Sequence, residues 1–205
     1  MPVVPARSRR GAEDQHRLLT AAGARLICEQ GIHSVNSNQI ARAAGVGVGT
    51  FYAHFRDKHE LLQVVVAGAV DALRLGIERA ATAAGDDLLE QVRAMVEAIV
   101  SFAELDPDGF RLAARPQRSR SGTRRPSVGH STRAAERRLA ALQAAGQLDL
   151  ALHPAVAARA FLSMQNGVVS WWLEDPGRAT RSELVDTLVR LHPAIAGNTS
   201  DASDH

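Results

Sequence analysis

The sequence predicts an all-α protein, and three observations support this fold class. Apolar residues recur at intervals of three and four positions, and no stretch alternates with a period of two. Alanine and leucine prevail over β-branched residues. Glycines, prolines and polar cap residues separate the periodic stretches at helical lengths. We expect about nine helices, divided between a three-helix N-terminal domain and a larger helical C-terminal domain.

The composition is that of an ordinary globular protein. The chain has 205 residues, of which 45% are hydrophobic and 22% charged, and this excludes disorder throughout. No apolar run approaches the roughly 18 residues of a membrane span, and no secretory signal is visible. The single cysteine, Cys28, excludes a multi-cysteine zinc site and an intramolecular disulfide framework. We therefore expect a cytoplasmic protein without a membrane partner.

The N-terminal domain is expected over residues 12–57. A basic segment, residues 1–11, precedes it and is expected to form a flexible arm. The first helix is predicted over residues 12–30, because its apolar residues share one helical face. Gly31 supplies the usual glycine after a helix end.

Two short helices are expected next. Asn36 and Gln39 are spaced as in a capping box, which predicts a helix over residues 37–44. Gly45 ends that helix, since glycine tolerates the left-handed conformation of a tight turn. A second helix is predicted over residues 47–55. The three helices together predict a helix-turn-helix domain.

The C-terminal domain is expected over residues 58–196. Asp57 and Glu60 mark the start of a long helix that ends near Gly85. A tail, residues 197–205, is expected to be disordered. The other helices are predicted, in order, from Asp86 or Asp87 through Ala103, over 107–114, over 131–145, over 154–174 and, from a capping box of Thr180 and Glu183, over 181–195.

The most informative stretch is residues 31–62, where the second short helix combines small, polar and aromatic side chains. Hydroxyl, imidazole and ammonium groups at Thr50, Tyr52, His54 and Lys58 suit contacts with phosphate oxygens. Lys58 is the chain's only lysine. Glycines at the start of the helix allow its backbone to approach a phosphate closely. The net charge of residues 1–60, +3 from eight basic and five acidic residues, is weak support for a nucleic-acid partner.

This stretch resembles the DNA-binding domain of the tetracycline-repressor (TetR) family of bacterial regulators. The run IARAAGVGVGTFYAHFRDKHELL, residues 40–62, matches that family's pattern. The resemblance covers about 45 residues with the first helix, and it departs mildly at Asn36-Ser37 and at Gly47. It implies that the chain contacts double-stranded DNA through Asn36, Ser37, Asn38, Gly47, Val48, Gly49, Thr50, Tyr52, His54 and Lys58.

Several of these residues have a plainer alternative role. Tyr52 is otherwise a surface aromatic residue, and His54 is either a phosphate ligand or a cap at the helix C-terminus, or both. Val48 is a candidate for contact with a thymine methyl group. His54 and His59 are five positions apart and do not share a helical face, so no metal pair is expected. The basic arm either enters a minor groove or is simply solvated.

The resemblance also implies a homodimer that responds to a small-molecule effector. The last two long helices carry more apolar surface than one packing face needs, so we expect a four-helix bundle across a two-fold axis. The alternative is that both apolar faces of these helices pack inside the chain's own core. The candidate interface residues are Val156, Ala160, Val168, Leu184, Leu188 and Leu191. The candidate pocket residues, chosen by apolar helix position, are Met95, Ile99, Phe102, Phe110, Met164 and Trp172.

The predicted function is therefore a DNA-binding transcriptional regulator, most simply a repressor on an inverted-repeat operator. An activator of the same family and a helical adaptor without DNA binding are the alternatives. An enzyme is disfavoured, because no catalytic cluster, metal-ligand spacing or cofactor motif is found, and we expect no cofactor. The arginine-rich segment, residues 115–125, either binds an anion or is a solvated loop.

Overall fold

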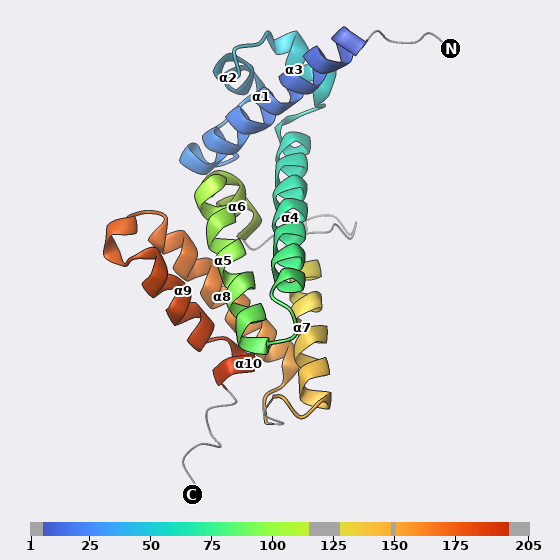
Figure 1. Ribbon diagram of the computed structural model, residues 1–205. Helices are drawn as coiled ribbons and strands as arrows, with labels where there is room; N and C mark the ends of the chain where they lie inside the picture. The colour runs from blue at the N-terminus through green and yellow to red at the C-terminus, as the bar shows by residue number, and fades with distance from the viewer. Residues whose placement is uncertain (1–5, 115–127, 149–150, 197–205) are drawn as a thin grey trace, which may run out of the picture. The chain divides into compact units, whose positions relative to one another are not determined.

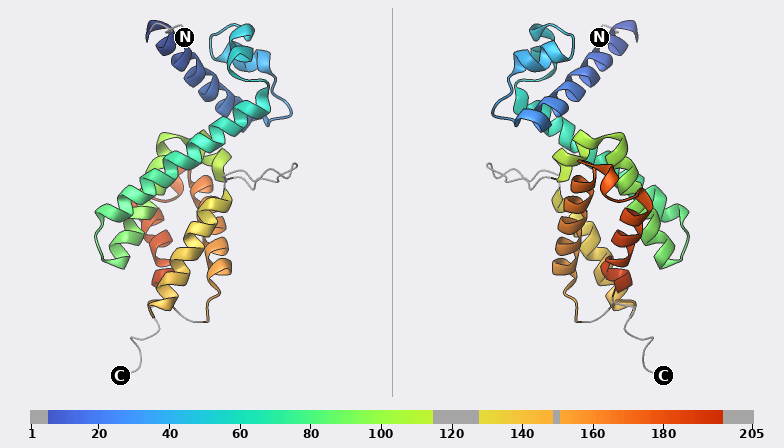
Figure 2. Two further views of the ribbon diagram at one scale, coloured as in Figure 1. Left: turned by 90° about the vertical axis from the view of Figure 1, so that its right-hand side faces the viewer. Right: turned by 90° about the vertical axis from the view of Figure 1, so that its left-hand side faces the viewer.

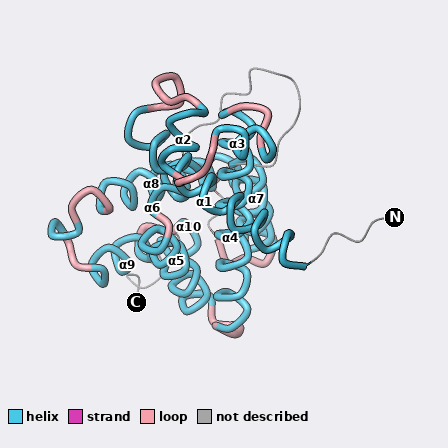
Figure 3. The backbone as a smooth tube through the Cα atoms, turned by 90° about the horizontal axis from the view of Figure 1, so that it is seen from above, coloured by secondary structure: helices cyan, strands magenta, loops and turns pink. Residues whose placement is uncertain are grey.

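The computed structural model describes residues 6–114, 128–148 and 151–196, and over these residues the chain is helical with no strand (Figures 1 and 3). The all-α prediction is confirmed, with ten α-helices where about nine were expected. They are α1 Ala6–Gln30, α2 Ser37–Ala43, α3 Val48–His54, α4 Lys58–Ala83, α5 Leu88–Leu105, α6 Pro107–Ala114, α7 Val128–Ala144, α8 Pro154–Trp172, α9 Arg181–Arg190 and α10 Pro193–Ala196, with a 3₁₀ turn at Pro176–Arg178.

The chain divides into two compact units, residues 1–69 and 70–205. The division lies inside α4, whereas the sequence placed the domain boundary at residue 57, where α4 is about to begin. None of the described helices is long and apolar enough to cross a membrane.

Unit 1 is built on α1, α2 and α3, whose buried side chains meet in one small core. Leu19, Ile40, Phe51 and Leu61 are inaccessible to solvent, and Phe55 is almost so. A Cβ atom at position 23 would overlap the Leu61 side chain, so Gly23 allows α1 and the start of α4 to approach closely. Helix α1 begins at Ala6, so residues 6–11, assigned above to a flexible arm, are helical.

The turn between α2 and α3 has the predicted chemistry. The Asn36 side chain accepts a hydrogen bond from the Gln39 backbone at 3.0 Å, and the Gln39 side chain accepts one from the Asn36 backbone at 2.8 Å. This is the expected capping box, and it satisfies two backbone donors at the helix start. Gly45 has a φ of +70°, which is why glycine is required there.

Unit 2 has its main core around α5. The buried face of α5 packs against α6 and α9, and α7 lies alongside α8 (Figures 1 and 2). The arginine at position 93 on α5 is paired with Asp186 on α9 at 2.6 Å. The core residues contributed by α5 are Val92, Val96, Ile99, Val100 and Ala103.

Two predicted elements need correction in unit 2. The last helix does not run to residue 195, because α9 ends at Arg190 and a separate short helix begins at Pro193. Proline lacks the backbone N–H and clashes with the preceding turn, so one continuous helix is excluded. Helix α7 begins at Val128 rather than near residue 131. The arginine-rich segment, residues 115–125, and the expected tail lie outside the described residues.

Candidate nucleic-acid interface and ligand cavity

The residues expected to contact DNA all belong to unit 1. They come from the cap and first turn of α2, from α3 and from the first residue of α4. None of them is buried, which is the minimum requirement for contact with a large partner. We call this the α2–α3 surface, formed by Asn36, Ser37, Asn38, Gly47, Val48, Gly49, Thr50, Tyr52, His54 and Lys58.

Tyr52 is the most prominent aromatic residue of the α2–α3 surface. Its side chain is 59% exposed, while its neighbour Phe51 is completely buried. The two rings meet edge to face, with centroids 5.4 Å apart and an interplanar angle of 84°. Edge-to-face contacts are favourable for aromatic rings. The buried ring therefore supports the exposed one and leaves the phenol hydroxyl free to reach a partner.

Lys58 has a structural role that the sequence did not reveal. Its ammonium group donates a hydrogen bond of 2.6 Å to the backbone carbonyl of Val35, just before α2. This contact joins the start of α4 to the segment that carries the α2 cap. An ammonium group has three donors, so two remain for a phosphate. Lys58 is thus suited both to orient the α2–α3 surface and to bind an anion.

The start of α4 is further ordered by Asp57. Its carboxylate accepts hydrogen bonds from the backbone amides of Glu60 and His59, at 2.9 and 2.8 Å. These two bonds, that of Glu60 first, lower the pKa of Asp57 below its ordinary value of 3.8. The carboxylate therefore caps the helix in its charged form. This cap holds Lys58, the next residue, in a defined position.

His54 is half-buried in the last turn of α3, where it contacts unit 1's first helix. Its ring lies edge-on to that of His16 on α1, with centroids 5.8 Å apart. His16 also packs against Phe55, at 5.0 Å. His54 therefore also packs α3 against α1. This role adds to the phosphate contact and the helix C-terminal cap that the sequence predicted. Arg42, exposed in the last turn of α2, is a basic residue that the sequence analysis did not select.

Unit 2 contains a largely apolar cavity of about 190 Å³ between α4, α5, α7 and α8. Of the six candidate pocket residues, Met95 and Ile99 line it. Phe110 and Trp172 are buried in the core instead, and Phe102 and Met164 pack against that core. The remaining lining residues are Leu73, Arg74, Ile77, Glu78, Val96, Ala134, Ala135, Phe161, Leu162, Gln165 and His192.

Gln165 and His192, two of the polar residues that line this cavity, were not selected from the sequence. Gln165 is only 2% exposed and is the one buried polar residue among those the structure describes. A glutamine within the apolar stripe of α8, between Phe161 and Val169, was the signal that could have found it. His192 packs against Phe161 with ring centroids 4.6 Å apart. Burial and the nearby charge of Arg138 lower the pKa of His192 to about 4, so its ring is neutral.

The candidate dimer residues separate into two groups. Leu184 and Leu188 are buried in the core of this chain, so these two predictions need correction. Val168 is partly buried against that core, and its place in an interface stays a prediction. The α9 face that carries the two leucines packs on α5 instead of remaining free for a partner. Val156, at 64% exposure, Leu191, at 50%, and Ala160 are open to solvent. The inner face of α8 is formed by Ala158, Phe161, Gln165, Val169 and Trp172.

Comparisons with known sequences match both parts of the chain. The family model described as bacterial regulatory proteins of the tetR family matches residues 19–65. The model described as the tetracyclin repressor-like C-terminal domain matches residues 85–194, which is more than half of the chain. The HTH-type transcriptional activator FasR of Mycolicibacterium smegmatis is 35% identical over 107 residues, or 52% of this chain and 48% of FasR. The chain thus spans about half the length of that relative.

Solved structures share the fold over nearly the whole chain. The MbdR regulator from Azoarcus sp. CIB is 17% identical and has a TM-score of 0.73, covering 89% of this chain and 98% of the other. AibR, solved in complex with isovaleryl coenzyme A and operator DNA, is 20% identical and has a TM-score of 0.67. That match covers 88% of this chain and 98% of AibR. At these identities the likeness establishes the fold.

Proposed function

The chain belongs to the TetR family of bacterial transcriptional regulators, and from this premise we propose that it binds an inverted-repeat operator as a homodimer and responds to a small molecule. The observation that carries the proposal is the α2–α3 surface, where every residue of the family's DNA-contacting pattern is accessible. Its site of action would be the bacterial cytoplasm, where the chromosomal DNA lies.

The α2–α3 surface offers two kinds of contact. Tyr52, Thr50 and Lys58 present hydroxyl and ammonium donors, which suit phosphate oxygens and orient a protein on the duplex. Val48, exposed in the first turn of α3, is suited to contact a thymine methyl in the major groove. Two such surfaces related by a two-fold axis would enter successive major grooves, so the operator should be palindromic.

DNA binding is tested by incubating the purified protein with fragmented genomic DNA and footprinting the best-enriched fragment. We expect one inverted repeat near a promoter. A protein that has been unfolded and refolded, and so freed of any retained ligand, is used in parallel. Failure of both preparations to enrich a fragment would favour the adaptor alternative.

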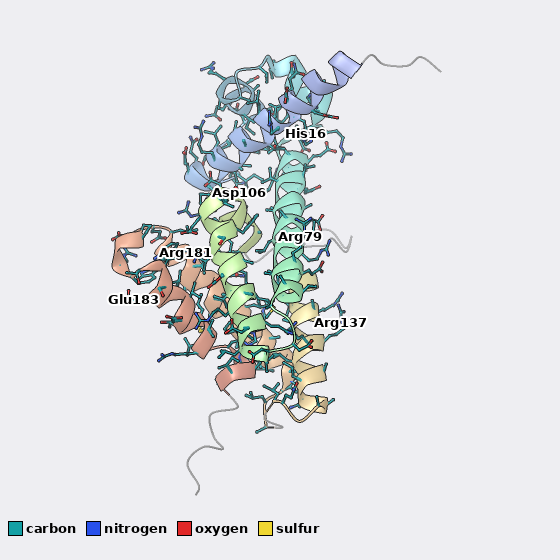
Figure 4. All side chains as sticks on the ribbon, viewed as in Figure 1. His16, Arg79, Asp106, Arg137, Arg181 and Glu183 are labelled. Carbon is teal, nitrogen blue, oxygen red and sulfur yellow. The ribbon has the colours of Figure 1, made fainter. Side chains whose placement is uncertain are left out.

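The roles of Tyr52 and Lys58 are tested by replacing each with Ala. Both variants are expected to weaken binding to all DNA sequences, because phosphate contacts carry no sequence information. For Lys58→Ala, the slope of log affinity against log salt concentration should fall by about one. Arg79→Ala, which removes an exposed charge from unit 2 (Figure 4), is the control and should leave affinity and slope unchanged. An unchanged affinity in Tyr52→Ala and Lys58→Ala would refute these roles.

The proposed homodimer would use the outer face of α8. Val156 and Ala160 lie on it, one turn apart, and Leu191 after α9 is a further exposed apolar residue. Exposed apolar residues of this size commonly mark contact surfaces when they occur together.

The prediction for this face is that Val156→Asp shifts the protein from dimer to monomer, because a carboxylate would be desolvated without a partner. Sedimentation velocity measures the shift. The matched control is Val64→Asp, which places the same change at an exposed valine of unit 1. A dimer that persists at low micromolar concentration in Val156→Asp would exclude this part of α8 from the interface.

The cavity in unit 2 is the proposed effector site. Helix α4 contributes Leu73, Ile77 and Glu78 to it, and the same helix begins at Lys58 of the α2–α3 surface. A ligand that binds more tightly to one arrangement of α4 would shift the equilibrium between a DNA-binding and a non-binding state. The size of the shift is set by the difference between the ligand's affinities for these two states. AibR, whose structure holds both a ligand and operator DNA, supports a ligand-responsive mode for this fold.

We retain repression as the proposed direction of regulation, with activation as the alternative because the FasR relative is named an activator. The position of the footprint distinguishes them. A repressor site should overlap the promoter, and a promoter-reporter fusion should be more active without the protein. An activator site should lie upstream, and the fusion should be less active without it.

A further inference from the structure

Arg138 on α7 is a cation with no acidic partner among the residues that the structure describes. One of its terminal nitrogens donates to the side-chain oxygen of Gln91 at 2.5 Å, and Gln91 is neutral. Its Nε–H is buried and makes no hydrogen bond. Across the described chain, no Asp or Glu forms an ion pair with Arg138. A buried donor without a partner costs free energy, so this arrangement is favourable only if something else supplies the acceptor.

Arg138 does not itself line the cavity of unit 2, but it adjoins residues that do. It follows the lining residues Ala134 and Ala135 by one turn of α7, and Gln91 precedes the lining residue Met95 by one turn of α5. Residues one turn apart share a helix face. The charge of Arg138 also reaches His192, which lines the cavity and whose pKa it helps to lower. The Arg138–Gln91 pair therefore flanks one end of the cavity.

Two further donors at this cavity lack acceptors. The side-chain amide of Gln165 makes no hydrogen bond within the described residues, although the residue is 2% exposed. In His192, Nδ1 accepts a hydrogen bond of 3.2 Å from the backbone of Ala194. A neutral imidazole that accepts at Nδ1 carries its proton at Nε2, so Nε2–H is a donor. The amide of Gln165 and the Nε2–H of His192 therefore place hydrogen-bond donors at the cavity.

The only charged residues among those lining the cavity neutralise each other. Arg74 and Glu78 are paired by two hydrogen bonds of 2.8 and 2.9 Å. Arg74 also approaches Asp71 at 3.9 Å, so the charged groups of α4 pair with one another, whereas Arg138 has no carboxylate partner among the described residues. His192 is neutral and adds no charge. An acceptor-only group with one negative charge would satisfy both the charge and the donors. A carboxylate is such a group, with two oxygens and about four acceptor positions.

We infer that the effector is a compact organic monocarboxylate, with its apolar body in the cavity and its carboxylate at the end flanked by Arg138. The inference rests on the proposed function, whose effector site it specifies. The volume, about 190 Å³, fits this class, because an apolar protein cavity of roughly 150 Å³ holds a benzene ring. Aliphatic walls from Leu73, Ile77 and Ile99 suit an aromatic or branched aliphatic body.

The test measures binding to the full chain by titration calorimetry, without DNA. The probes are benzoate and 3-methylbutanoate, each compared with its carboxamide, which keeps the shape and lacks the charge. We expect each carboxylate to bind at least about tenfold more tightly than its carboxamide, because hydrogen bonds to a charged group are stronger than those to a neutral one.

Arg138→Met should abolish this preference, and Arg138→Lys, which keeps the charge, should retain part of it. The matched control is Arg137→Met, the adjacent exposed arginine (Figure 4), which should bind like the unmodified protein. Gln165→Leu removes donors without changing charge and should weaken benzoate binding about fivefold. Thermal unfolding of each variant verifies that it is folded. If Arg138→Met is unfolded, the two single variants Gln165→Leu and Arg138→Lys provide the test.

Two results would overturn the inference. They are equal binding of carboxylate and carboxamide, and a preference unaffected by Arg138→Met. Absence of binding by every carboxylate probe would also count against it. None of these results bears on DNA binding, which the genomic fragment experiment measures independently. The failure of this inference is therefore distinguishable from the failure of the proposed function.

Discussion

Phe51→Ala is expected to lower the free energy of unfolding of unit 1 by about 3–5 kcal/mol. Phe51 is completely buried, and its ring packs against that of Phe55, with centroids 5.7 Å apart, and supports that of Tyr52. Removing it leaves a cavity in a core that α1, α2 and α3 share. A unit of this size has a small free energy of unfolding, so unit 1 should be unfolded in a large fraction of the molecules at 37 °C.

The comparison with Tyr52→Ala makes this prediction specific. Tyr52 is the next residue along α3 and is mostly exposed, so its truncation should cost less than about 1 kcal/mol of unfolding free energy. Phe51→Ala should lose DNA binding because the domain unfolds, whereas Tyr52→Ala should weaken it because a contact is lost. Urea unfolding followed by circular dichroism separates the two causes. Equal stability of the two variants would show that Phe51 does not support the α2–α3 surface.

Leu188→Ala is expected to destabilise unit 2 by about 2–5 kcal/mol, the usual range for a buried leucine. Leu188 has no exposed surface and belongs to the core cluster that joins α9 to α5. That cluster includes Val96 and Ile99, which also line the proposed effector cavity. The substitution should therefore lower both the unfolding temperature of the protein and its affinity for an effector.

Leu191→Ala is the matched control for Leu188→Ala. Leu191 lies three positions further on and is half-exposed, so the same truncation should change the unfolding free energy by no more than about 0.5 kcal/mol. Sedimentation velocity on both variants separates core from interface. If Leu188→Ala dissociated the dimer without lowering the unfolding temperature, the original assignment of Leu188 to the interface would be correct after all.

The local structure of unit 1 could be predicted because it depends on short-range chemistry. The capping box of Asn36 and Gln39 and the left-handed glycine at 45 act within four residues, so they are readable in the sequence. The buried positions Ile40, Phe51 and Phe55 follow from the helical period. What could not be predicted there is the contact from Lys58 to Val35, because it joins residues 23 positions apart.

Helix boundaries were predicted less well where two signals compete. The apolar period continues through Leu188, Leu191 and Ile195, and this favoured one long helix, but Pro193 ends it. At the other end of the chain, residues 6–11 carry basic side chains and no apolar period, yet α1 includes them. An apolar period in the sequence predicts a helix. A helical turn without apolar residues has no such period and therefore cannot be predicted in this way.

The sequence by itself determined the fold class, the helix-turn-helix and the residues that form the α2–α3 surface. These properties depend on periodicity, on caps and on a motif of adjacent residues. Only the tertiary structure decided which face of each C-terminal helix is internal. It placed Leu184 and Leu188 in the core, and it brought Gln165 and His192 to one cavity, one turn of α7 from Arg138. The physical reason is that a helix with two apolar faces can bury either face against its own chain and the other against a second copy. Only the packing of the other helices decides which face becomes internal.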